Sequence, residues 1–182
     1  MNTYVILLRG INVGGKNKVS MAALKKHLEE QGYSNVTTYI ASGNVILESD
    51  QSADAIKARI EETLPGRFNL DSELIKALVL DHHQLRAVID KKPEGFGEQP
   101  DKYHSDAIFL IDIDASQAMS VFNPKVGVDK IWPGDGVIYS QRLSALRTKS
   151  RLSKVMGTQL YKSMTIRTWN TTEKLLELAN RL

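Results

Sequence analysis

The segment Tyr4–Met21, YVILLRGINVGGKNKVSM, decides how the first half of this sequence is interpreted. Thr3–Arg9 is rich in Val, Ile and Leu, which predicts a buried strand. A loop with three glycines follows. Apolar residues spaced by three and four then predict a helix over Met21–Gln31, with Ser20 as its N-cap and Gly32 as its stop. The segment therefore predicts a strand, a glycine-rich loop and a helix in immediate succession.

Strand and helix signals continue along the chain and then repeat. After Lys91–Ser105, a linker-like segment with two prolines and two glycines, the pattern starts again. The expected strands are 3–9, 35–41, 45–48, 73–80, 106–112, 129–132, 137–141 and 164–167, and the expected helices are 21–31, 52–64, 81–89, 116–122, 152–160 and 171–181. Asp81 with Gln84 resembles a capping box, and Asn170 or Thr171 is the expected N-cap of the last helix.

This order predicts an α+β fold of two tandem ferredoxin-like (βαββαβ) subdomains, each followed by a helix. The expected division is 1–90 for the N-terminal subdomain and its helix, 91–105 for the linker, and 106–182 for the C-terminal subdomain and its helix. The segment SGNVILES in the first half resembles GDGVIYSQ in the second, which favours an internal duplication. Two unrelated α+β halves are the alternative.

Composition restricts the class of protein and the kinds of site. With 182 residues, 42% hydrophobic and 25% charged, the chain is long enough to bury a core, as one domain or two small subdomains. The absence of cysteine excludes disulfides, thiolate zinc sites and cysteine nucleophiles, and it is typical of a reducing compartment. The N-terminal apolar run is far shorter than a membrane span. We therefore expect a cytoplasmic protein with no membrane partner.

The charge distribution is the strongest functional signal. Residues 1–28 contain five basic side chains and no acid, and residues 136–172 contain seven basic side chains and again no acid. A surface of one sign raises the local concentration of the opposite charge. The two windows therefore predict an anionic partner.

Three motifs carry a resemblance to a known family: LLRGINVGGKNKVSMAALKKHLEEQGY (7–33), TYIASGNVIL (38–47) and MTIRTWNTTEKLLELA (164–179). Together they resemble an uncharacterised bacterial family that is marked by the Leu-Leu-Arg-Gly-Ile-Asn-Val-Gly-Gly and Ser-Gly-Asn motifs. The third motif in that family usually reads Arg-Asn-Trp-Asn-Thr, and Thr168 replaces the first asparagine here. The resemblance implies a two-part α+β fold, and it implies no substrate, cofactor or catalytic residue.

The first candidate site is the loop Arg9–Lys18. Its glycines allow close backbone approach, its N–H groups can form an anion nest, and Arg9 can bind a carboxylate or phosphate with two hydrogen bonds. The loop has neither the Walker spacing nor Gly-x-Gly-x-x-Gly. A flexible surface loop is the alternative. The predicted ligand-binding residues here are Arg9, Asn12, Gly14, Gly15, Lys16 and Asn17.

The second candidate site is Arg142–Lys154, RLSALRTKSRLSK, in which serines alternate with basic residues. Such a pattern combines two groups that bind phosphate: cations, which neutralise its charge, and hydroxyls, which donate hydrogen bonds to it. A solvated basic face is the alternative. Arg167 lies beside Trp169 and Asn170, for which core packing and helix capping are the simpler interpretation. The predicted ligand-binding residues of this half are Arg142, Lys149, Arg151 and Arg167.

The function predicted from these patterns is binding of a phosphate-bearing anion, such as a nucleotide or phosphometabolite, in a basic groove between the subdomains. Nucleic acid is a possible ligand, although the strand Val45–Leu47 offers no aromatic residue for base stacking and the corresponding strand of the second half offers Tyr139. One alternative is a small phosphohydrolase or acyl-phosphate enzyme that uses Arg9 and Asn44, with Asn44 orienting a water. Another is a regulatory or protein-interaction module. The spacing of the four histidines predicts no metal site, and no cofactor is expected.

Overall fold

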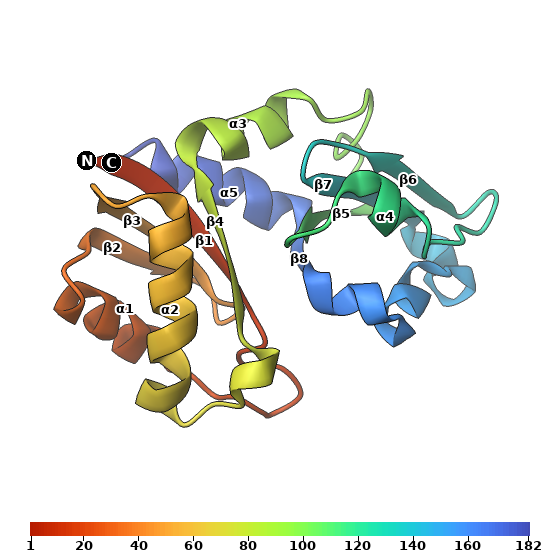
Figure 1. The fold of residues 1–182 in the computed structure, drawn as a ribbon. Helices are drawn as coiled ribbons and strands as arrows, with labels where there is room; N and C mark the ends of the chain where they lie inside the picture. The colour runs from red at the N-terminus through yellow and green to blue at the C-terminus, as the bar shows by residue number, and fades with distance from the viewer. The chain divides into compact units, whose positions relative to one another are not determined.

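The computed structural model describes all residues from Met1 to Leu182 and contains two four-stranded antiparallel sheets, each with helices. The predicted α+β class is confirmed, and the arrangement is that of two tandem ferredoxin-like subdomains (Figure 1). The contacts divide the chain into unit 1, formed by Met1–Arg86 and Lys174–Leu182, and unit 2, formed by Ala87–Glu173.

Unit 1 contains a sheet in the order β2-β3-β1-β4, with two helices packed on one face. Ile6 and Leu8 point to that face, where they meet Leu24 of the first helix and Ile56 of the second in one apolar cluster. The elements are β1 (Asn2–Arg9), α1 (Met21–Glu30), β2 (Ser34–Tyr39), β3 (Asn44–Ser49), α2 (Ala53–Phe68), η1 (Ser72–Leu74), β4 (Lys76–Asp81) and α3 (His82–Asp90).

Local hydrogen bonds explain where the helices of unit 1 begin and end. The Ser20 hydroxyl accepts the Ala23 N–H, which confirms the predicted N-cap of α1. Asp81 and Gln84 exchange side-chain and backbone hydrogen bonds of 2.8 and 2.9 Å, as the predicted capping box requires. The expected end of α2 before Pro65 is wrong: the helix continues to Phe68, and left-handed Asn69 ends it.

Unit 2 contains a sheet in the order β6-β7-β5-β8. Its elements are β5 (Tyr103–Leu110), α4 (Ala115–Met119), β6 (Asp129–Pro133), β7 (Val137–Leu143), three 3₁₀ turns η2 (Ser144–Lys149), η3 (Leu152–Gly157) and η4 (Gln159–Ser163), β8 (Met164–Thr168) and α5 (Trp169–Ala179). The single helix expected over 152–160 is wrong. Gly157 disfavours a continuous helix, and Thr158 is extended and donates its hydroxyl back to the Val155 carbonyl.

An aromatic cluster on one face of the unit 2 sheet joins residues of β6 and β7 to Phe96 and to Trp169 of α5. Phe96 is fully buried and makes edge-to-face contacts with Trp132, Tyr139 and Trp169 at centroid distances of 5.0–5.9 Å. The Tyr139 hydroxyl donates to the Val88 carbonyl at 2.7 Å. The segment 91–105 therefore contributes to the core of unit 2.

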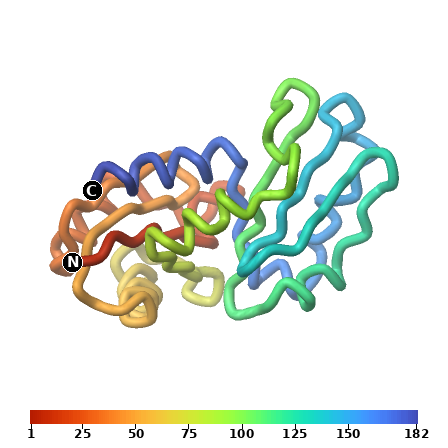
Figure 2. Tube along the Cα trace, turned by 90° about the horizontal axis from the view of Figure 1, so that it is seen from above, coloured from red at the N-terminus to blue at the C-terminus, as the bar shows by residue number.

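The helix α5 begins as part of unit 2 and ends as part of unit 1. Its N-cap is Thr168, whose hydroxyl oxygen accepts the Thr171 N–H at 3.3 Å, so the expected cap at Asn170 or Thr171 is wrong. Figures 1 and 2 show both chain ends side by side in unit 1. None of the helices is long and apolar enough to cross a membrane.

Candidate functional site

The glycine-rich loop of unit 1 is a two-residue hairpin turn. Gly14 and Gly15 have φ of 57° and 76°, and the Lys16 N–H donates to the Val13 carbonyl at 2.9 Å. A type I′ turn requires positive φ at both central residues, so its geometry explains both glycines. Lys16 and Lys18 are exposed beside this turn.

The asparagines of this loop hold its backbone. The Asn12 amide donates to the carbonyls of Val19 and Ala41 at 3.0 and 2.8 Å, and its oxygen accepts the Val19 N–H. Asn17 donates to the Gly10 carbonyl and accepts the Asp71 N–H. These bonds join the loop to the 40–43 turn and to the 71–74 segment at one end of the sheet.

Two residues of the phosphohydrolase hypothesis lie at this end of unit 1. Arg9 is half-buried at the end of β1, where it pairs in register with Lys76 of β4. Asn44 is fully buried, and its amide nitrogen donates to the Tyr39 carbonyl and the Ser42 hydroxyl at 2.9 and 3.0 Å. Both amide hydrogens of Asn44 are thus used inside the turn, which leaves none for a water.

The basic segment of unit 2 wraps around a buried carboxylate. Asp129 accepts the backbone N–H groups of Lys125 and Arg151, each at 2.8 Å. Burial opposes ionisation, but these hydrogen bonds and the charge of Arg142 bring the pKa of Asp129 below its ordinary value. Arg142 lies across the ladder from Asp129, while Lys149 is exposed. The structure thus places Arg142 and the backbone of Arg151 next to one acid.

Arg167 is buried in β8 and is 6% exposed. Its guanidinium donates to the Thr165 hydroxyl at 2.8 Å and to the Ile166 carbonyl at 2.9 Å, and burial lowers its pKa to about 10. Tyr139, the aromatic residue considered for base stacking, is also buried and packs on Phe96. Neither Arg167 nor Tyr139 is therefore exposed on the surface of unit 2.

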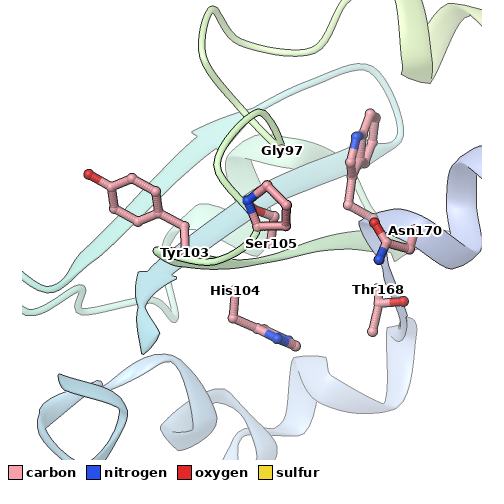
Figure 3. A pocket seen from close by; sticks show the side chains of 8 residues that line it. Gly97, Tyr103, His104, Ser105, Thr168 and Asn170 are labelled. Carbon is pink, nitrogen blue, oxygen red and sulfur yellow. The ribbon is translucent and has the colours of Figure 1, made fainter. Parts of the chain in front are cut away.

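A pocket opens where β8 stops pairing with β5. The last paired residues are Asp106 and Thr168, so Tyr103–Ser105 extend beyond the end of β8 just where the chain turns into α5. The notch has a volume of about 180 Å³ and is lined by these strand residues, by Thr168–Asn170, and by Gly97 and Pro100 (Figure 3). All of them belong to unit 2.

Hydrogen-bond donors dominate this pocket. The Trp169 side chain is 3% exposed and packs against the Gly97 backbone, and its indole N–H has no partner within the chain. The Asn170 amide is exposed and also has no partner. The backbone N–H groups of Trp169 and Asn170 precede the first helical hydrogen bond, and the third N–H of the turn is capped by Thr168. The pocket therefore presents several N–H groups and no carboxylate.

A histidine–aspartate pair lies at the edge of the pocket. His104 and Asp106 are two residues apart on β5, and Asp106 pairs with Thr168, so all three side chains lie on one face of the sheet. Figure 3 shows His104 and Thr168 on that face. His104 Nε2 lies 3.0 Å from Asp106 Oδ1. The imidazole is 39% exposed and the carboxylate 15% exposed, so the acid is covered and the base is accessible.

Burial makes the ionised form of Asp106 less favourable than it is in water. Burial raises the pKa of the Asp106 carboxyl, and the charges of His104 and Arg142 act in the opposite direction. A raised folded-state pKa contributes stability that is fully present below the unfolded-state pKa, about 3.9, and is lost as pH rises through the folded value. At neutral pH the ionised Asp106 thus costs stability.

We therefore expect Asp106→Asn to stabilise the protein at pH 7, by an amount on the order of 1 kcal/mol, and to lose this advantage near pH 4. Urea unfolding at both pH values measures this difference. Asp135→Asn, in the exposed turn before β7, is the control and should change neither value. If Asp106→Asn lowered the free energy of unfolding by the same amount at pH 7 and pH 4, the claim that ionised Asp106 costs stability would be contradicted.

The sequence predictions did not identify the pocket. None of the ten predicted ligand-binding residues lines it, whereas His104, Thr168, Trp169 and Asn170 do. The sequence did contain one signal for it: His104 lies two residues before Asp106, where a strand is predicted to begin, and Thr168 precedes the last predicted helix. No group of three His, Asp or Glu side chains in the structure is arranged to hold a metal ion.

Comparison with known proteins gives a family and a fold. A family model described as "Protein of unknown function (DUF1697)" matches residues 1–139. A solved structure, described as a conserved bacterial protein from Streptococcus pneumoniae, is similar with a TM-score of 0.83 and 24% identity over 99% of each chain. That similarity shows the fold alone. No curated protein matches the sequence.

Proposed function

Since the chain belongs to the DUF1697 family of proteins of unknown function, we propose that unit 2 binds a small anionic ligand in the pocket at the start of α5. The ligand class is a compound with a phosphate or carboxylate group. The observation that carries the proposal is the Trp169 indole N–H, which has no partner within the chain and belongs to a residue that lines the pocket. An anion in the pocket would accept from this donor, and hydrogen bonds to a charged acceptor are stronger than neutral ones.

The surroundings of the pocket support an anion over a cation or an uncharged ligand. The first turn of α5 carries a partial positive charge and free N–H groups, which together favour negative charge. The lining side chains include no Asp or Glu. Arg142 is the cross-strand neighbour of His104 and adds positive charge beside the pocket. The basic residues of the 3₁₀ turn η2 add further positive charge to unit 2. A ligand anion is attracted by this field before it makes contact.

The predicted ligand-binding residues of unit 1 remain a separate prediction. Lys16 and Lys18 are exposed and can attract an anion, but the Asn12 and Asn17 amides are engaged within the loop. We assign Arg142, Lys149 and Arg151 a steering role in unit 2, because none of them lines the pocket.

We expect inorganic phosphate and phenyl phosphate to bind wild-type protein and Trp169→Phe to weaken binding about tenfold or more. A hydrogen bond to a charged group contributes about 1.5–3 kcal/mol, and 1.4 kcal/mol is tenfold in affinity. Isothermal titration calorimetry measures the change. Trp132→Phe is the matched control, because Trp132 also contacts Phe96 but lies outside the pocket. Equal weakening by both substitutions, or no binding by wild type, would overturn the proposal.

A further inference from the structure

The His104–Asp106 pair has a hydrogen-bonding arrangement that anion binding alone does not need. Nε2 of His104 is the nitrogen that faces Asp106, at 3.0 Å, and Nδ1 has no partner within the chain. When Asp106 accepts a hydrogen from Nε2, the imidazole takes the tautomer whose Nδ1 carries a lone pair. A covered carboxylate therefore holds an accessible base at the edge of the pocket.

The charges that face this pair come from neighbouring strands. Arg142 of β7 is the cross-strand partner of His104, and Asp129 of β6 is the cross-strand partner of Arg142. On the other side, β8 contributes the neutral Thr168. Arg142 is thus shared between Asp106 and Asp129, and the base itself faces neutral groups on the pocket side.

We propose that the pocket hydrolyses an acyl bond in a small anionic compound, with His104 as general base and Asp106 as its positioning residue. The inference rests on the proposed anion binding. In the step, Nδ1 of His104 takes a proton from water while the water oxygen bonds to the carbonyl carbon. The bond from that carbon to the leaving oxygen then breaks, and the imidazolium returns its proton to the leaving group. The products are a carboxylic acid and an alcohol or phosphate.

The donors of the pocket favour acyl over phosphoryl chemistry. Acyl transfer develops one oxyanion, which neutral N–H groups stabilise, and the first α5 N–H groups are donors of that kind. Phosphoryl transfer spreads charge over three oxygens and typically uses Arg, Lys or metal ions as clamps. No Arg or Lys is among the lining residues.

The test is hydrolysis of acetyl phosphate, an anionic acyl compound, with p-nitrophenyl acetate as the uncharged comparison. We expect the wild type to hydrolyse acetyl phosphate more efficiently. His104→Gln should reduce kcat about 100-fold or more, since general base catalysis contributes about 10²–10⁴-fold. Asp106→Asn should lower kcat while KM stays nearly constant, a split that a purely structural role would not produce.

The controls separate this inference from the proposed function. His83→Gln, at an exposed histidine of unit 1, should leave turnover unchanged. Melting temperatures of all variants show whether each protein folds. Phosphate binding without turnover of either acyl substrate would overturn the hydrolysis inference and leave anion binding intact. Turnover that depends on His104 without phosphate binding would overturn the proposed anion site instead. Turnover unaffected by His104→Gln would also end the inference.

Discussion

Gly10→Ala is expected to destabilise unit 1 by about 3–5 kcal/mol, a large share of the 5–15 kcal/mol that typically holds a protein folded. Gly10 has a φ of 91°, which an L-residue rarely adopts. A Cβ at this position would lie 2.1 Å from the Leu74 carbonyl oxygen. That carbonyl is backbone, so no side-chain rotation can relieve the overlap.

The segment that would have to move is held from two sides. Its Asp71 N–H donates to Asn17, and the Leu74 N–H donates to the Asp71 carbonyl. Gly14→Ala is the control, because Gly14 has a φ of 57° and open space around it. We expect Gly14→Ala to cost about 1 kcal/mol. Urea unfolding measures the loss of stability in both variants. Equal losses for Gly10→Ala and Gly14→Ala would show that the contact with the Leu74 carbonyl does not determine stability.

Phe96→Ala is expected to destabilise unit 2 by about 3–5 kcal/mol, the usual cost of deleting a buried phenyl ring. Phe96 is fully buried and contacts three other aromatic rings, so the surrounding side chains cannot close the cavity without losing their edge-to-face geometry. Near-UV circular dichroism should lose aromatic signal. Hydrogen exchange should accelerate in the sheet of unit 2 before that of unit 1.

The phenyl ring also supports the pocket. Gly97 follows Phe96 directly and packs on the Trp169 indole, so loss of the ring should weaken phosphate binding as well. Phe96→Leu is the matched control, because it preserves most of the volume and should cost about 1.5 kcal/mol or less. A Phe96→Ala protein as stable as wild type would show that the 91–105 segment contributes nothing to the core.

The sequence predicted the parts of the fold that depend on periodicity and local chemistry. Apolar content and alternation together located every strand, and the Asp81–Gln84 box and the Ser20 cap are confirmed by their hydrogen bonds. Spacing could not show that residues 152–160 form 3₁₀ turns instead of the expected α-helix, because apolar residues in successive 3₁₀ turns have a spacing similar to that of an α-helix. The composition of 91–105 resembles that of a linker, although Phe96 makes it part of a core.

The pocket could not be predicted because it depends on register. Basic residues were a visible signal, but Arg167 is buried and Arg142 lies behind the edge of the pocket. The pocket is lined by Tyr103–Ser105 because β8 ends opposite Asp106. A single sequence does not specify that strand pairing. The partnerless indole of Trp169 likewise depends on where Gly97 packs.

The two tryptophans provide the most direct measurement of the central claim, that the anion site is the pocket at the start of α5. Each indole N–H gives one proton–nitrogen NMR signal, and Trp169→Phe assigns them. On titration with inorganic phosphate, we predict a saturable shift of the Trp169 signal and of the Asn170 side-chain amide, with Trp132 unchanged. Shifts confined to the backbone amides of residues 9–18, with both indole signals unmoved, would contradict it.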